Sequence, residues 1–231
     1  MFEPFPGERD LEKGRRLSAS AKFRRAAVYY QVAERMQGRD NPRRMDAYSN
    51  ALHYADRWIT LGRLPIEHVD LPYEGKSFPA LFWQVRSQDG RPAPAVVICN
   101  GLDSTKEIIL WTGIGRALTE RGISALFVDQ PGSGAAVRLN GITGVHDSER
   151  WAAPAVDWLE ARKAVDPKRI GRRRIQARAD HRMAQHLDYL TCSIPATAAL
   201  ILMITHYSVI RFAVSSIVIL SRTWTDGSVP I

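Results

Sequence analysis

The segment from Ala95 to Gly134 constrains the fold of this chain more than any other part of it. It begins with a short apolar run ending at Cys99, which is too brief for a helix and is typical of a strand buried on both faces. A pattern with helical spacing follows from Lys106 to Arg121, and a second apolar run begins at Ile123. Strand, helix and strand joined by short connections predict a βαβ unit with a parallel sheet.

Two loops leave the carboxyl ends of these predicted strands, and such loops carry the functional residues in parallel α/β sheets. They are Asn100 to Thr105 and Asp129 to Gly134. In the first loop, Asp103 or Ser104 is expected to cap the helix that follows, because short oxygen-bearing side chains accept from free helical N–H groups. Gly122, directly after the helical pattern, is expected to end that helix with a positive φ.

The chain before this unit contains two further predicted parts. Residues 8–61 contain no strand-like run and predict helices, with a break at Gly38–Asp40 and a second start at Asn41-Pro42. No repeat at a fixed period supports a helical-repeat interaction module, so we interpret this part as a cap or appendage on the sheet. Alternating residues at Ile66–Leu71 and Phe78–Val85, joined by a turn, then predict a β-hairpin.

A crossover helix is expected after the βαβ unit, from about Ser148 to Ala164, and Lys168–Gly171 is expected to approach another strand.

The composition is that of an ordinary globular protein, with 45% apolar and 24% charged residues. The net charge is +8, but from Arg169 onward eight basic residues face three acidic ones, so the main body is nearly neutral. Nucleic-acid binding is therefore not expected.

The two cysteines, Cys99 and Cys192, match no metal or redox spacing and are expected to be buried thiols. No metal or cofactor is expected. The first ten residues, MFEPFPGERD, lack the apolar segment behind a basic start that marks a secretory signal, so we expect a cytoplasmic protein. The oligomeric state is left open, with a homo-oligomer as one alternative.

Two motifs occur together in the βαβ unit: GLDSTKE at 101–107 and DQPGSG at 129–134. Together with the hairpin and the helical N-terminus, they resemble the first half of an α/β-hydrolase. Within that superfamily the chain resembles the group of 2,6-dihydropseudooxynicotine hydrolase and dipeptidyl-aminopeptidase-like esterases. The resemblance covers about Glu8 to Gly171, and the two motifs are specific only in combination. The fold class expected is α/β, with an incomplete hydrolase sheet, a helical appendage and an unmatched C-terminal tail.

This resemblance implies a Ser-His-Asp hydrolase that acts on a small-molecule ester, amide or ketone-type substrate, cleaving ester, amide or activated C–C bonds. The oxyanion hole would include backbone N–H groups of Gly101 and Leu102, because an amide there points at the oxygen that becomes negative. Asp103 would be an orienting acid, and a plain capping role is the alternative. Ser133 lies in Gly-Ser-Gly rather than Gly-x-Ser-x-Gly, so we interpret it as part of a structural loop.

The nucleophile elbow is expected within about ten residues of Gly171, and no Gly-x-Ser-x-Gly occurs there. No catalytic nucleophile, acid or histidine is therefore assigned. His146 and Asp147 are interpreted as loop or capping residues. The histidines of the tail are given no role: His181, His186 and His206.

Arg172 to Arg174 are not expected to form the buried central strand, since burying unpaired guanidinium groups costs several kcal/mol, roughly. We favour the hypothesis that the reading frame slips near Gly171. The alternative is a genuine tail whose apolar stretch, within residues 189–220, attaches a non-catalytic protein to a membrane or to a partner. The predicted organisation is 1–64 helical, 65–171 half a hydrolase domain and 172–231 tail. An unpaired sheet edge is expected beside the strand at Ile123.

Overall fold

The computed structural model describes residues 5–38, 40–85, 90–101, 104–145, 149–175 and 201–204. The helices are α1 (Pro6–Glu12), α2 (Arg16–Arg35), α3 (Arg43–Leu61), α4 (Lys106–Trp111), α5 (Ile114–Thr119), α6 (Gly134–Arg138) and α7 (Glu149–Glu160). The strands are β1 (Ile66–Tyr73), β2 (Lys76–Trp83), β3 (Ala93–Cys99), β4 (Ser124–Val128), β5 (Val165–Ile175) and β6 (Ile201–Ile204).

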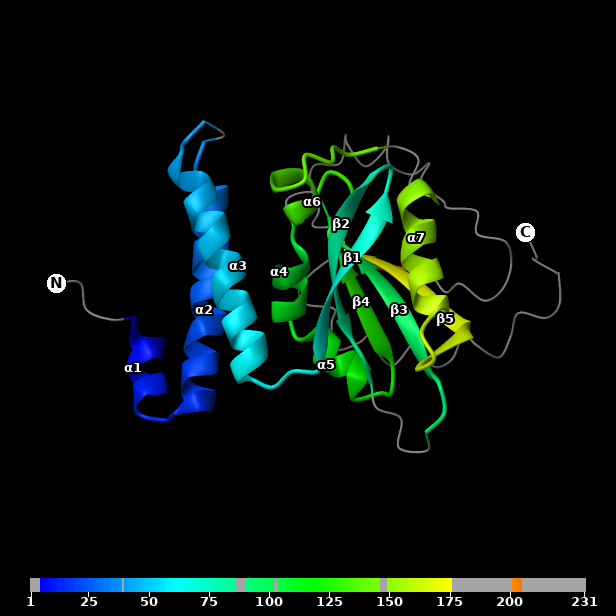
Figure 1. Ribbon diagram of the computed structural model, residues 1–231, viewed down its shortest axis with the longest axis horizontal. Coiled ribbons are helices and arrows are strands. Elements are labelled where there is room, and N and C mark those ends of the chain that lie inside the picture. The colour runs from blue at the N-terminus through cyan, green and yellow to red at the C-terminus, as the bar shows by residue number, and fades with distance from the viewer. Residues whose placement is uncertain are drawn as a thin grey trace.

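The strands form one sheet in the order β1-β2-β4-β3-β5-β6 (Figure 1). The predicted hairpin is confirmed: β1 and β2 are antiparallel and turn at Glu74 and Gly75, which both have positive φ. The predicted βαβ unit is also confirmed, because β3 and β4 pair in parallel. The expected unpaired edge beside Ile123 is wrong. Strand β4 has an antiparallel neighbour, β2, on its other side.

The expectation that the arginine run stays out of the sheet is wrong. Strand β5 continues past Gly171 to Ile175 and lies between β3 and β6, with Val97 opposite Arg172 and Cys99 opposite Arg174. Backbone pairing on both sides satisfies the N–H and C=O groups of this segment whatever its side chains are. The expectation rested on the cost of burying the guanidinium groups alone and left out the hydrogen bonds that the backbone gains by pairing on both sides.

The single helix expected from Lys106 to Arg121 is two short helices, α4 and α5. Gly113 separates them with a φ of 86°, a left-handed conformation that a side chain would disfavour. Gly122 has a φ of 74°, as expected for the residue after the pattern. The cap of α4 is Thr105 rather than Asp103 or Ser104, and its Oγ1 accepts from the N–H of Ile108 at 3.3 Å.

The helical N-terminus contains three helices instead of two, because α1 precedes the long antiparallel pair α2 and α3. The buried face of α2 includes Phe23, Ala26 and Ala27, whereas Leu17 and Val32 are exposed. Figure 1 shows the order of layers: the pair α2 and α3, then α4 and α5, then the sheet, then α7.

Each face of the sheet has its own apolar core. One core joins β1, β2, β3 and β4 to α7 through residues such as Phe82 and Leu159. The other joins the opposite face to α4, α5 and the end of α3 through residues such as Phe127, Ile109 and Ile59. Coverage on both faces explains why the βαβ strands are continuous apolar runs.

Within the described ranges, no helix combines the length and apolar character that a bilayer crossing requires. Residues 201–204 of the apolar tail form β6, paired in parallel with β5. The rest of the 189–220 stretch lies outside the described residues. So do Leu102, Asp103, His146, Asp147, His181, His186, Cys192 and His206.

Candidate active site at the carboxyl edge of the sheet

Asp129, the residue after β4, is the centre of a buried polar cluster at the carboxyl ends of β3 and β4. It is fully buried, and its two oxygens accept from four donors. Oδ1 accepts from the backbone N–H of Lys106 at 2.8 Å and from Nδ2 of Asn100, and Oδ2 accepts from Nζ of Lys106 and from the N–H of Ala135, both at 2.9 Å. One carboxylate therefore ties the end of β4 to the starts of α4 and α6.

Negative charge suits this position, because free N–H groups at the starts of two helices converge on it. Gly134, the last residue of the DQPGSG motif, lies against the side chain of Asp129 and has a φ of 44°. A Cβ on Gly134 would overlap the carboxyl group of Asp129. The motif therefore requires glycine here for two reasons, conformation and close approach.

Lys106 lies between two carboxylates. Its Nζ is 2.9 Å from Oδ2 of Asp129 and 2.6 Å from Oε1 of Glu107, and its side chain is only 5% exposed. Burial by itself disfavours the charged ammonium group, but the charges of Asp129 and Glu107 outweigh burial and raise the pKa of Lys106. Lys106 is therefore a fixed cation that holds the two carboxylates together.

The loop that starts with Asn100 is fixed to the other loop by a reciprocal pair of hydrogen bonds. The backbone N–H of Asn100 donates to Oε1 of Gln130 at 2.9 Å, and Nε2 of Gln130 donates to the backbone oxygen of Asn100 at 2.7 Å. The side-chain amide of Gln130 thus extends the β3–β4 pairing by one residue. Gly101, next along, is buried, and its carbonyl accepts from the N–H of Ser104 at 3.2 Å.

Ser133 belongs to the same cluster but is used inside its loop. Its hydroxyl donates to the backbone oxygen of Gln130 at 2.9 Å, and the residue is 4% exposed. This geometry suits the structural role expected from the Gly-Ser-Gly spacing. Cys99, at the end of β3, is buried as expected.

The helical layer reaches this cluster through a second set of charges. Glu34 of α2 is 1% exposed and receives two hydrogen bonds from Arg138 of α6, at 3.0 and 3.1 Å, and one from Nε of Arg44 at 2.8 Å. Burial by itself would raise the pKa of Glu34, but the two arginines outweigh it and hold that pKa below its usual range. Arg138 also lies over the ring of Tyr48 of α3, 5.1 Å from its centroid.

Tyr48 is fully buried, and burial, with the charges of Glu107 and Asp129, raises the pKa of its hydroxyl well above the ordinary value. The ring is therefore neutral at any ordinary pH. Helix α2 makes a second contact through Gln31, whose Oε1 accepts from the hydroxyl of Thr105 at 3.0 Å. The α2 and α3 pair is thus fixed to the first loop through Thr105 and to α6 through Arg138.

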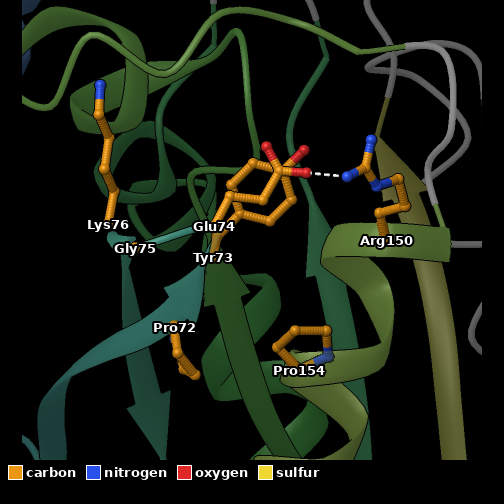
Figure 2. A pocket seen from close by; sticks show the side chains of 7 residues that line it. All are labelled: Pro72, Tyr73, Glu74, Gly75, Lys76, Arg150 and Pro154. Atoms are coloured by element: carbon orange, nitrogen blue, oxygen red, sulfur yellow. Dashed lines mark ion pairs between the residues drawn. The ribbon is translucent and has the colours of Figure 1, made fainter.

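A separate hollow of about 430 Å³ lies at the tip of the hairpin, next to the first turns of α7. Figure 2 shows Arg150 of α7 reaching toward Glu74 of the turn, with which it forms an ion pair. Tyr73 and two prolines, Pro72 and Pro154, lie beside this pair. None of the described residues that line the hollow belongs to the Asp129 cluster, so it is not part of the candidate active site.

Sequence reasoning placed Gly101 at this edge but assigned no role to Asp129, Lys106 or Glu107. All three lie in the two motifs, and a charged residue directly after a buried strand was a usable signal. Glu34 and Arg138 are 104 positions apart and gave none. Within the described residues, no group of three or more His, Cys, Asp and Glu side chains is placed to hold a metal ion.

A mixed sheet covered on both faces, with loops fixed at its carboxyl edge, defines an α/β protein. The chain belongs to the FrsA-like esterase family, whose model matches residues 8–207. This match continues beyond Gly171.

One curated protein and two solved structures are similar to this chain. The chain is 29% identical over 163 residues to 2,6-dihydropseudooxynicotine hydrolase of Paenarthrobacter nicotinovorans, which covers 70% of this chain and 40% of that protein. A crystal structure of 2,6-dihydroxy-pseudo-oxynicotine hydrolase superposes with a TM-score of 0.62 at 24% identity, covering 74% of this chain and 46% of that one. The structure of AbyA5 has a TM-score of 0.52 at 24% identity, covering 73% and 45%. The chain therefore spans less than half the length of these relatives.

Proposed function

We propose that this chain carries the oxyanion side of a hydrolase active site for a small-molecule ester, amide or activated C–C substrate. The donors would be the backbone N–H groups of Gly101 and Leu102, with Asp103 as an orienting acid. The observation that carries the proposal is the reciprocal pairing of Asn100 with Gln130, because it fixes the residue before Gly101 at the edge where the chemistry of this fold occurs. The name of the curated relative makes 2,6-dihydropseudooxynicotine the first substrate to test.

The sheet order indicates where a nucleophile would be expected in this fold. Strand β5 is the parallel neighbour of β3, with Arg174 opposite Cys99, so the two strands end at the same edge of the sheet. In this fold the strand-to-helix turn at that place presents the serine. The sequence has no Gly-x-Ser-x-Gly there or elsewhere, so we propose that the chain as written forms no acyl-enzyme.

A serine-reactive fluorophosphonate probe tests this directly, with mass spectrometry to locate any label and p-nitrophenyl acetate to measure turnover. We expect no labelled serine and no turnover above that of the Ser133→Ala variant. A serine that is labelled stoichiometrically, with turnover that the label abolishes, would contradict the proposal. Denatured protein provides the background for nonspecific labelling.

The reading-frame hypothesis is a separate proposal. It is supported by the sequence alone, in which three consecutive arginines follow Gly171 at the place where the approach to a nucleophile elbow is expected. Reading CGN arginine codons one base later allows Val-Val-Gly, which suits a strand buried between two neighbours. Resequencing the coding DNA around codon 171 tests it: an inserted or deleted base supports it, and an unchanged sequence rejects it.

A further inference from the structure

The sequence contains two Asn-Gly pairs, and the fold places them in opposite environments. Asn100 is fully buried at the end of β3, where its Nδ2 donates to Oδ1 of Asp129, and Gly101 beside it is also buried. Asn140 is half-buried in the turn that follows α6, and Gly141 is exposed with a φ of 61°. The same dipeptide therefore occurs once inside the Asp129 cluster and once at the surface.

An Asn-Gly pair can lose ammonia without an enzyme, because glycine has no side chain to hinder attack by its backbone nitrogen on the preceding carboxamide. At the surface pair, the nitrogen of Gly141 would form a bond to Cγ of Asn140, and the bond between Cγ and Nδ2 would break. The backbone N–H gives its proton to a solvent base, and Nδ2 takes a proton from water and leaves as ammonia. Water then opens the cyclic imide at either carbonyl carbon, which gives an aspartate or an isoaspartate.

The surroundings of the peptide group between Asn140 and Gly141 favour this attack. The N–H of Gly141 makes no hydrogen bond to any described residue. The carbonyl of the same peptide group, the backbone oxygen of Asn140, accepts from Nζ of Lys76 at 3.1 Å. An ammonium group at that oxygen stabilises the negative charge that the peptide group carries once its nitrogen has lost the proton. Figure 2 shows the Lys76 side chain directed away from the ion pair of Glu74 and Arg150.

The two carboxamides are restrained to different degrees. Nδ2 of Asn140 is held by one hydrogen bond, to the backbone oxygen of Ser77 at 2.6 Å, and Ser77 is itself only half-buried. A single contact at the surface opens easily. Asn100 is fixed inside the Asp129 cluster beside a buried glycine, so its reaction requires the loop to unfold locally.

We propose that Asn140 is a site of spontaneous deamidation, promoted by Lys76, and that the fold protects Asn100 from the same reaction. The product places a negative charge near Lys76 and removes the donor to Ser77 that ties β2 to the turn after α6. The modification is independent of the proposed hydrolase chemistry, because it uses only residues of this turn and water.

Incubation of the purified full-length chain at mildly alkaline pH, followed by peptide mass spectrometry, tests the proposal. One sample stays folded and a second is unfolded in guanidinium chloride, where only the local sequence matters and the two pairs should react at similar rates. In the folded sample we expect Asn140 to react at least about tenfold faster than Asn100, because a buried site reacts only through open states. Equal rates at the two sites in the folded chain, or no product at Asn140, would overturn the proposal.

The contribution of Lys76 is tested with Lys76→Gln, and Lys163→Gln makes the same change at an exposed lysine between α7 and β5. In the folded chain we expect Asn140 to react at least about threefold more slowly in Lys76→Gln than in Lys163→Gln, because the ammonium group no longer stabilises the deprotonated peptide. In guanidinium chloride the two variants should react alike. An equal or faster rate in folded Lys76→Gln would overturn the role assigned to Lys76.

Discussion

The two faces of the sheet are held by different physics. The face that meets α7 is an apolar core with aromatic pairs, such as Phe82 against Trp158 at 5.1 Å between ring centroids. The face that meets α4 also has an apolar core, but at its carboxyl edge it ends in buried charges around Asp129 and Glu34. Apolar packing tolerates small shifts, whereas a buried ion pair stabilises only when its geometry is satisfied. We therefore expect the geometry of the charged edge to be fixed more strictly than that of the face that meets α7.

The largest effect is expected at the charged edge, from Asp129→Ala. This change removes four hydrogen bonds at once and leaves Lys106 buried with one carboxylate instead of two. We expect a loss of about 4 kcal/mol in the free energy of unfolding, measured by urea denaturation. The control is Asp157→Ala on the exposed side of α7, which should change it by less than about 0.5 kcal/mol. Equal effects of the two variants would show that the cluster does not hold the edge.

A somewhat smaller effect is expected on the other face, from Leu159→Ala. Leu159 is fully buried between α7 and the sheet, so the change leaves a cavity, and we expect a loss of about 3 kcal/mol. Leu159→Met should lose less than about 1.5 kcal/mol, because an apolar core accepts a residue of similar volume. If Leu159→Met were as damaging as Leu159→Ala, the α7 face would be as strictly fixed as the charged edge.

An intermediate effect with a pH signature is expected from Glu34→Gln. At neutral pH we expect the free energy of unfolding to fall by about 1–3 kcal/mol. The reason is that Arg138 and Arg44 would then donate to a neutral amide instead of a carboxylate. The lowered pKa of Glu34 means that its stabilisation is complete above about pH 4.3, the ordinary value, and disappears as the pH falls through the folded-state pKa. The wild type should therefore lose stability more steeply than the variant below about pH 4. Parallel pH profiles would contradict the assigned role.

The smallest effect is expected at an exposed ion pair between β1 and α3. His68 and Asp56 lie 3.2 Å apart with side chains that are 59% and 57% exposed. We expect Asp56→Asn to change the free energy of unfolding by less than about 0.5 kcal/mol, because water screens such pairs. The hydrogen bond to Asp56 raises the pKa of His68, so any stabilisation should be present at acidic pH and be lost as the pH rises through that pKa. A loss above about 1 kcal/mol would mean that burial is not what distinguishes the ion pairs of the charged edge from this exposed pair.

Local signals accounted for much of the fold. Alternation predicted the hairpin, short apolar runs predicted β3 and β4, and Gly122 ended its helix with a positive φ. The break at Gly113 was missed because apolar spacing continues through it. The pairing of Arg172 was missed because a strand is stabilised by its neighbours' backbones as well as by its own side chains.

The sequence by itself determined the hairpin, the βαβ unit, the glycine that ends its helical segment at Gly122 and the lack of a nucleophile motif, since each depends on residues close together in the chain. Only the tertiary structure decided that Asp129, Lys106 and Glu107 form one buried cluster and that Glu34 reaches Arg138 across 104 positions. Contacts of that kind depend on how whole elements pack, and the burial that makes their charges matter exists only after packing. No local pattern in the sequence predicts these contacts.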